Sequence, residues 1–296
     1  MTGGLTSDVT GDVIVVGGGA GGLTAALVLA RARHRVVLVE DGTPRNATVD
    51  EFHGFPTRDT TSPARFRADA MAELGSYAVT LVHDEVTGAR SADRRVSLTL
   101  AHGGNVRGNA MVLATGVHDE LPPIPGLAER WGRSVFNCPF CDGWEHRDRP
   151  VVVIDAAPGV AHLAGLVRSW TTQVAVVAAA DVAALTGDGT SLEQVVLRDG
   201  RVVHASAAFV KAPVVPRSAI ARWLRCIVDT DGYIVTSGTG ATSHPLVWAA
   251  GDVRRPPPLP HQVVLAAADG STAAIDIHRS FVAARVLTVN REPTST

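Results

Sequence analysis

Two cysteines and an aspartate stand close together in this 296-residue sequence and could carry out redox chemistry. They occur in the run Cys138-Pro-Phe-Cys141-Asp142. Two thiols at this spacing can close a small disulfide ring, and a helix starting there would lower the pKa of the thiolate. The Asp142 carboxyl is placed to move a proton during dithiol-disulfide exchange. We therefore predict that Cys138, Cys141 and Asp142 are catalytic residues.

Half of a zinc site is the alternative interpretation of the same cysteines. Cys226 or His146 would be among the candidates to complete it, but no second C-x-x-C and no paired histidines follow at a usual spacing. Three cysteines in so long a chain also cannot form the disulfide framework of a secreted protein. We predict a redox pair without a bound metal, and we expect Cys226 to be a small core residue.

The second motif is a G-x-G-x-x-G sequence at residues 17–22, which follows the apolar run 13–16 and opens an alanine-rich helix at 23–32. Glycine at these points allows a tight turn and close approach of a pyrophosphate to the backbone, while the helix N-terminus supplies positive potential. Glu40 closes a second strand, 35–40, where a carboxylate can accept ribose hydroxyl hydrogens. This order predicts dinucleotide binding rather than a simple glycine-rich turn. The residues predicted to bind it here are Gly17, Gly19, Ala20, Gly22 and Glu40.

The third motif follows the strand-like run 246–250 and reads Ala250-Gly251-Asp252. An acid after a strand can hold a ribityl hydroxyl, and the N-terminus of the following helix, 261–286, can stabilise the negative charge of a reduced flavin. Alone, this motif would indicate only an ordinary aspartate between a strand and a loop. Its interpretation as a cofactor site depends on the other two motifs. The residues predicted to bind the cofactor here are Gly251, Asp252, Gln262 and Val263.

A related strand, helix and strand pattern begins again at residue 150. Residues 151–154 and 173–177 are strand-like, and 159–170 can form a helix. At roughly 150 residues per domain the length predicts about two domains. Two such units therefore indicate two nucleotide-binding-type domains, separated by a proline-rich linker at 121–126.

Composition and charge exclude several classes of protein. Apolar residues make up 46% of the chain and charged residues 19%, which argues against disorder. A net charge of -2 argues against a nucleic-acid or anionic-membrane partner. The N-terminus lacks the pattern of a signal peptide, and the apolar stretches are too short to span a membrane. We expect a soluble cytoplasmic protein.

Together the motifs resemble the low-molecular-weight thioredoxin reductase family of FAD-dependent disulfide oxidoreductases. The strand end Ala114-Thr-Gly116 and the run Asp231-Gly-Tyr-Ile-Val235 also match, in family order. The continuation Trp144-Glu145-His146 resembles the branch that contains dithiol oxidases of natural-product pathways, such as those closing the disulfides of gliotoxin and holomycin. The resemblance implies bound FAD, contacts from Gly116 and a homodimer.

The implied fold is α/β, with two Rossmann-like, three-layer ββα-type domains and the second inserted in the first. The expected boundaries are an FAD-binding domain at 1–120 and 245–296, and between them a module at 121–244 that carries the cysteine pair. In a thioredoxin reductase the second domain binds NADPH through its own glycine turn, but here Asp155 and Ala157 replace the first two glycines. Their side chains would crowd and repel a pyrophosphate.

Electron flow follows from that replacement. No cation for a 2'-phosphate follows the strand 173–177, so we expect NADPH binding to be lost, although a divergent loop that still binds NADPH is the alternative. A small-molecule dithiol would then reduce the cysteine pair, FAD would take the electrons, and O2 would reoxidise the flavin to give H2O2. By resemblance Cys141 would lie nearest the flavin and Cys138 would exchange with the substrate.

Other functions stay open at this point. One is a disulfide reductase for thioredoxin or a similar protein, fed by NADPH or ferredoxin, and another is a flavin-binding regulatory protein without catalysis. Three histidines, His53, His118 and His146, could assist proton transfer or approach the flavin, but we expect structural roles for them.

Overall fold

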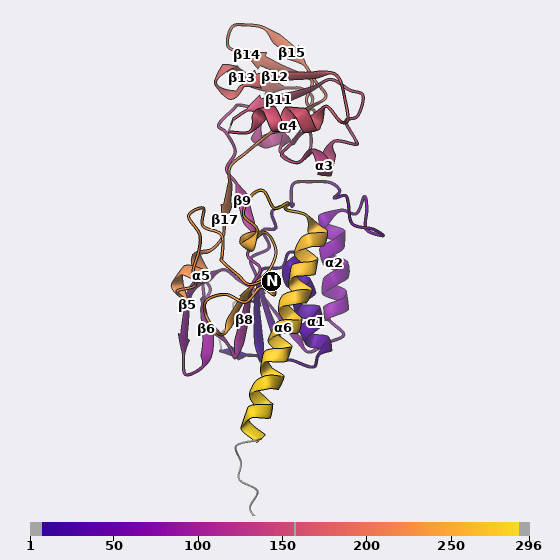
Figure 1. Cartoon of the computed structure of the whole chain (residues 1–296). Helices are drawn as coiled ribbons and strands as arrows, with labels where there is room; N and C mark the ends of the chain where they lie inside the picture. Colours follow the sequence, from indigo (N-terminus) through magenta and orange to yellow (C-terminus); the bar gives the residue numbers. More distant parts are fainter. Residues whose placement is uncertain (1–7, 157, 290–296) are drawn as a thin grey trace, which may run out of the picture. The chain divides into compact units, whose positions relative to one another are not determined.

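The computed structural model describes residues 8–156 and 158–289, and its chain divides into two compact units. Unit 1 comprises Met1–Pro44, Phe66–Val117 and Pro216–Thr296, and unit 2 comprises Arg45–Arg65 and His118–Val215. Figure 1 shows the elements of both.

Unit 1 is built on a five-stranded parallel sheet whose central strands are buried and apolar. Continuous valine, isoleucine and leucine runs suit strands that are covered on both faces. In sheet order the strands are β18 (Val247–Ala249), β8 (Ala110–Leu113), β2 (Val13–Val16), β3 (Val36–Glu40) and β4 (Val79–His83).

Helices cover one face of this sheet and a second sheet covers the other. Side chains of α1 (Ala20–Arg31), α2 (Pro63–Leu74) and α6 (Val263–Val289) pack in one cluster with the first face, and the three helices lie side by side in Figure 1. The opposite face packs against a four-stranded sheet. Its strands in order are β1 (Val9–Thr10), β7 (Asn105–Gly108), β6 (Arg95–Leu100) and β5 (Val86–Ala92).

Two glycines let α1 and α6 approach each other closely. A β-carbon at Gly270, in α6, would lie 2.0 Å from the carbonyl oxygen of Gly21, in α1. A side chain at this crossing would separate the helices, so Gly270 fixes where α6 lies on α1.

Unit 2 repeats the three layers. Its parallel sheet has α4 (Val160–Val167) on one face and a three-stranded antiparallel sheet on the other. The fold class predicted from the sequence, α/β with two Rossmann-like ββα domains, is therefore confirmed. The parallel strands in order are β10 (Val135–Phe136), β16 (Ala207–Val210), β11 (Val151–Asp155) and β12 (Val174–Ala178), and the antiparallel strands are β13 (Val182–Thr186), β14 (Gln194–Leu197) and β15 (Val202–His204).

The chain changes unit at both ends of segment 45–65, and again within β9 (Val117–Asp119) and β17 (Val214–Pro216), which form a two-stranded sheet. Unit 2 ends at Val215, earlier than the boundary at 244 expected from the sequence. The physical reason is that α5 (Ala219–Trp223) and the chain after it pack into the core of unit 1. Cys226 is 6% exposed in that core, as predicted.

Short elements complete the chain. The expected strand at 233–235 forms only an isolated bridge between Ile234 and Val228. The remaining helices are α3 (Pro139–Asp142) and three 3-10 turns, η1 (Ala128–Arg130), η2 (Ala179–Asp181) and η3 (Asp252–Arg254). Among the residues described, no helix has the length and apolar character needed to cross a membrane.

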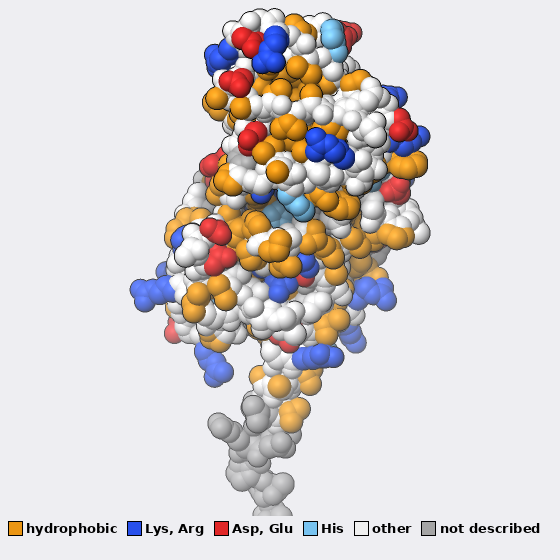
Figure 2. All heavy atoms as spheres, turned by 45° about the horizontal axis from the view of Figure 1, so that its top comes forward, with side chains coloured by type: hydrophobic (Ala, Val, Ile, Leu, Met, Phe, Trp, Pro, Cys, Tyr) orange, Lys and Arg blue, Asp and Glu red, His pale blue; other side chains and the backbone are white. Residues whose placement is uncertain are grey.

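Charged side chains of both signs are scattered over the surface in Figure 2 rather than gathered into a patch of one sign. This view agrees with the near balance of 29 acidic and 27 basic residues. The face seen in this view offers no continuous track for nucleic-acid phosphates.

Candidate redox and cofactor sites

The cysteine pair lies on a single tight turn in unit 2. Cys138 is the N-cap of α3 and Pro139 is its first residue, a position where the missing N–H costs nothing. The backbone N–H groups of Cys141 and Asp142 donate to the carbonyl oxygen of Cys138 at 3.1 and 3.2 Å. A β-carbon at Gly143 would lie 2.4 Å from the carbonyl oxygen of Pro139, so glycine is required where the turn ends.

The two thiols differ in acidity. A hydrogen bond from the Cys141 thiol lowers the pKa of Cys138 to about 7, helped by the N–H groups of Cys141 and Phe140 and by the charge of Arg45 and opposed by burial. The same hydrogen bond, together with burial and the charges of Cys138 and Asp142, raises the pKa of Cys141. Cys138 is therefore the thiol that carries negative charge near neutral pH.

Asp142 has the acidity that a proton carrier needs. Burial raises the pKa of its carboxyl, helped by the nearby charges of Cys138 and Glu145 and opposed by that of His53, and the net result is a pKa of about 7. A group with a pKa near the working pH can both give and take a proton. Cys138, Cys141 and Asp142 thus lie on one turn, as their spacing in the sequence predicted.

Segment 45–65 belongs to unit 2 and brings charged side chains to this turn. The His53 ring lies between two carboxylates, 3.7 Å from Asp59 and 3.8 Å from Glu145. Arg45 acts on both thiols and is held by Asp119. The sequence motifs did not identify Arg45 or Asp119, because their pairing is long-range and neither belongs to a recognisable spacing.

The other two histidines have simpler surroundings. His118 is exposed, whereas the His146 ring packs against Phe136 with ring centroids 5.2 Å apart. Burial lowers the pKa of His146, which favours a neutral packed ring over a proton carrier. Over the described ranges 8–156 and 158–289, no cluster of three or more histidine, cysteine or carboxylate side chains is arranged to hold a metal.

In the glycine turn of unit 1, the first and last glycines are packed against the backbone, whereas Gly19 has open space beside it. Gly17 has a φ of 107°, and a β-carbon there would lie 2.2 Å from the carbonyl oxygen of Ala114. A β-carbon at Gly22 would lie 1.8 Å from the carbonyl oxygen of Gly17. At Gly19, by contrast, no atom lies within 4 Å of a β-carbon position. Ala20 begins α1 directly after this open point, at a cap without a side-chain hydrogen bond.

Glu40 lies beside that turn, but its carboxylate already has partners. A β-carbon at Gly18 would lie 2.9 Å from Glu40 Oε2. The carboxylate pairs with Arg67 and with His83, each at 2.6 Å, and accepts the Gly42 N–H at 3.1 Å. These three partners hold the Glu40 carboxylate in place. Its contact with a ribose hydroxyl stays a prediction.

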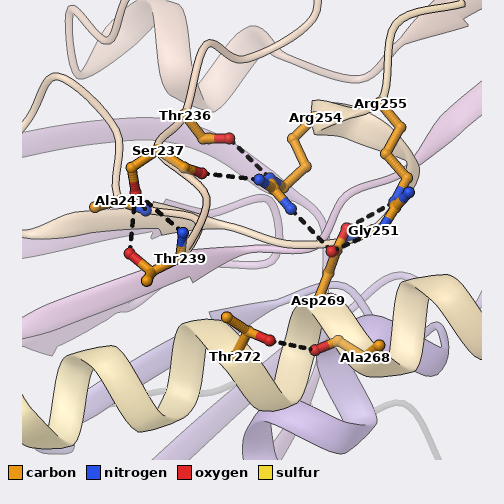
Figure 3. Close-up of polar contacts among 10 residues, drawn as sticks. All are labelled: Thr236, Ser237, Thr239, Ala241, Gly251, Arg254, Arg255, Ala268, Asp269 and Thr272. Carbon is orange, nitrogen blue, oxygen red and sulfur yellow. Dashed lines mark hydrogen bonds and ion pairs between the residues drawn. The ribbon is translucent and has the colours of Figure 1, made fainter. Parts of the chain in front are cut away.

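The loop of the third motif is fixed by a buried acid that the sequence analysis missed. Asp269, in α6, accepts the Gly251 N–H at 3.2 Å and pairs with Arg254 and Arg255, each at 2.8 Å (Figure 3). Arg254 also donates to Thr236 Oγ1 at 2.8 Å. Asp269 therefore holds both ends of η3, the turn that begins with Asp252.

The remaining predicted cofactor residues lie at chain positions that suit a ligand. Gly116 has a φ of 66° with no atom within 4 Å of its β-carbon position. Gln262 and Val263 stand at the start of α6, where the Ala266 N–H donates to the Gln262 carbonyl. The open glycine turn, the start of α1 and the start of α6 fit the pyrophosphate and flavin parts of FAD.

Comparison with known proteins identifies a family. The model of the pyridine nucleotide-disulphide oxidoreductase family matches residues 11–181 and 169–270. The solved structure of HlmI is 36% identical, with a TM-score of 0.89 over 98% of both chains. An oxidoreductase from Agrobacterium tumefaciens is 32% identical, with a TM-score of 0.84 over 93% of this chain and 99% of that one.

Curated relatives match over a shorter stretch. The thioredoxin reductase tcpT of Claviceps purpurea is 34% identical over 157 residues, which is 52% of this chain and 49% of tcpT. A probable thioredoxin reductase of Arthroderma benhamiae is 37% identical over 48% of this chain and 37% of that protein. The matched region thus spans about half or less of the length of these relatives.

Proposed function

The chain belongs to the pyridine nucleotide-disulphide oxidoreductase family, and from this premise we propose that it oxidises a small-molecule dithiol to a disulfide with O2 as the electron acceptor. As a member of this family it is an oxidoreductase whose cofactor is FAD. We assign FAD binding to unit 1 and the exchange of disulfides to unit 2.

One observation carries the proposal: unit 2 has a redox pair with an activated thiol, while its sequence has Asp155 and Ala157 where a dinucleotide turn needs glycines. Cys138 has a pKa of about 7. Asp155, in contrast, closes β11 where a glycine is needed, and Lys211 reaches the same turn, donating to the Pro158 carbonyl at 2.7 Å. Ala157, the other replaced glycine, lies outside the described residues. In this proposal the electrons come from a substrate dithiol, which reduces the cysteine pair, and not from the hydride of NADPH.

The exchange proceeds in two displacements. A substrate thiolate attacks the sulfur of Cys138, the Cys138–Cys141 bond breaks, and its electron pair goes to Cys141, which takes a proton from Asp142. The second substrate thiolate then attacks the substrate sulfur bonded to Cys138. That bond breaks, Cys138 leaves as a thiolate, and the substrate leaves as a disulfide. A leaving thiol with a low pKa departs faster, which suits Cys138 for this position.

The cycle closes with two electrons moving to oxygen. Bound FAD would supply the two-electron chemistry that links the enzyme dithiol to O2, and two electrons with two protons would give H2O2. The chain's own part is to restore the disulfide: Asp142 accepts the proton that Cys141 releases. The starts of α1 and α6 hold the cofactor's negative charges.

Anaerobic reduction of the flavin tests the proposal. Dithiothreitol, as probe dithiol, should bleach the flavin absorbance of wild type and of Cys226→Ser, the matched control with a buried core cysteine. It should not bleach Cys138→Ser, and admitting air to the wild type should restore the absorbance and give one H2O2 per flavin. Rapid bleaching by NADPH would overturn the proposal in favour of a disulfide reductase, the activity in the names of several relatives. Bleaching by neither donor would leave a flavin-binding regulatory protein.

We also propose a homodimer, on the resemblance alone. Light scattering from the holoprotein should give twice the 30.9 kDa of one chain. A single-chain mass at all concentrations would contradict this.

A further inference from the structure

The guanidinium of Arg45 is fixed in unit 2 by a carboxylate. Its Nε and Nη2 donate to Asp119 Oδ2 and Oδ1 at 2.8 and 2.6 Å. The Asp119 side chain is 8% exposed and that of Arg45 is 24% exposed. Two parallel hydrogen bonds of this kind hold a guanidinium in one orientation. Arg45 is therefore a fixed charge rather than a mobile surface side chain.

The same carboxylate is tied to the chain that leads into the cysteine turn. The Asn137 side-chain amide donates to Asp119 Oδ1 at 3.2 Å, and Asn137 directly precedes Cys138. Asp119 thus joins Arg45, from segment 45–65, to the start of α3. All of these residues belong to unit 2.

The charge of Arg45 acts on the reacting sulfurs. It lowers the pKa of Cys138 and opposes the rise in the pKa of Cys141. The other charged groups near the pair are Asp119, whose carboxylate is paired with Arg45, Asp142, which raises the pKa of Cys141, and beyond it His53 and Glu145, which act on Asp142. Arg45 is thus the guanidinium whose charge reaches both thiols.

We propose that Arg45 stabilises the Cys138 thiolate during disulfide exchange and that Asp119 is the positioning residue that holds its guanidinium in place. The inference rests on the proposed function, because it takes Cys138 as the thiol that exchanges with the substrate. When the substrate disulfide forms, the electron pair of the breaking bond stays on the Cys138 sulfur. A cation that is already in position stabilises this charge without any rearrangement.

The pKa of Cys138 itself is the measurement that tests this. In the reduced full-length holoprotein, the rate of alkylation by iodoacetamide follows the thiolate fraction as pH is varied, and mass spectrometry assigns it to Cys138. Arg45→Met removes the charge, which is the smallest of the contributions to this pKa, and we expect the pKa to rise by roughly 0.3–0.5 units and alkylation at pH 7 to slow about 1.5- to 2-fold. Arg45→Lys should recover part of the rate, since it restores the charge without the paired hydrogen bonds.

Two further variants keep the test decisive. Arg147→Met is the matched control, because Arg147 stacks on the exposed Trp144 ring at 4.1 Å and should leave the pKa of Cys138 unchanged. Should Arg45→Met fail to fold by circular dichroism, Arg45→Gln keeps a donor for Asp119 without the charge and should show the same rise.

An unchanged pKa in Arg45→Gln or Arg45→Met, or an equal rise in Arg147→Met, would overturn the inference. The measurement needs neither substrate turnover nor O2. A chain that failed as a dithiol oxidase would therefore still show whether Arg45 stabilises the thiolate.

Discussion

Three neighbouring strands of the parallel sheet follow the same order in both units, but the carboxyl edges of the two sheets differ. In unit 1 β2 lies between β8 and β3, and in unit 2 β11 lies between β16 and β12. Three residues follow Val16 before α1 begins, whereas five follow Ile154 before α4 begins. Val160, the first residue of α4, stands where the tight turn of unit 1 has Gly22.

The residues at the two edges have opposite character. Ala114, small and uncharged, follows β8, and Glu40 closes β3. Lys211, the one lysine of the sequence, follows β16, and Ala178 closes β12. If unit 2 does not bind NADPH, as we propose, then a few positions at the edge of the sheet, and not the fold alone, decide whether a dinucleotide binds.

The largest expected effect breaks the turn of unit 1. Gly22→Ala places a β-carbon 1.8 Å from the Gly17 carbonyl oxygen, so we expect the free energy of unfolding to fall by roughly 2–4 kcal/mol and bound FAD to be lost. Denaturant titration and flavin absorbance measure both. Gly165→Ala is the control: this exposed position of α4 has open space, and alanine there should stabilise the protein by about 0.5–1 kcal/mol. A Gly22→Ala protein as stable as wild type would contradict the tight turn.

Ligand binding sharpens the comparison between the units. Added to apoprotein at about 100 times its Kd, FAD should raise the free energy of unfolding by roughly 2.7 kcal/mol, because it binds the folded state. NADPH at the same concentration should give no shift in a thermal unfolding experiment. A shift with NADPH would show that the edge of unit 2 still binds dinucleotides. A shift that arises only in Lys211→Ala would identify Lys211 as the group that excludes them.

A smaller effect isolates the open side of the first turn. Gly19 has a φ of -80° and space around it, so Gly19→Ala should leave the stability of the apoprotein within about 0.5 kcal/mol of wild type. The added methyl group occupies the space assigned to the pyrophosphate, and the Kd for FAD should rise about tenfold, or about 1.4 kcal/mol. Quenching of FAD fluorescence during titration of the apoprotein measures it. An unchanged Kd would mean that the cofactor does not approach Gly19.

Local patterns explain how much of this could be predicted. The glycine turn and the cysteine turn each occupy six residues or fewer, and their chemistry follows from residue type and spacing within that stretch. The buried strands β2 and β11 are short, continuous apolar runs, a pattern that indicates a buried parallel strand without knowledge of the rest of the chain. The strand, helix and strand pattern occurs twice in the sequence, and this repetition indicated two Rossmann-like domains.

Long-range pairing explains what could not be predicted. Asp269 lies in α6, and the residues next to it in the sequence are mostly small. This local sequence does not indicate that Arg254 and Arg255 pair with its carboxylate. Arg45 and Asp119 are 74 residues apart and meet only in the folded chain. Unit 2 ends at residue 215 and not at the expected 244 for the same reason: α5 packs into the core of unit 1, and this packing depends on contacts with residues far away in the sequence.

The smallest expected effect concerns the protons of the cysteine turn, the chemistry that unit 2 has in place of a dinucleotide turn. Burial raises the pKa of Asp142, and its carboxyl must be protonated to give a proton to Cys141, so the rate constant for enzyme reduction per substrate thiolate should fall as pH rises through that raised pKa. In Asp142→Asn this fall should be absent. A positive charge at His53 lowers the pKa of Asp142, and His53→Gln should therefore move the fall to higher pH by about half a unit.

Stopped-flow flavin absorbance with dithiothreitol between pH 5.5 and 8.5 measures the profile under anaerobic conditions. His118→Gln is the matched control, because His118 is exposed and should leave the profile in place. A fall that persists in Asp142→Asn would assign the proton to another group. A shift to lower pH in His53→Gln would show that His53 does not act on Asp142 through its positive charge, since removal of a nearby cation can only raise the pKa of a carboxyl group.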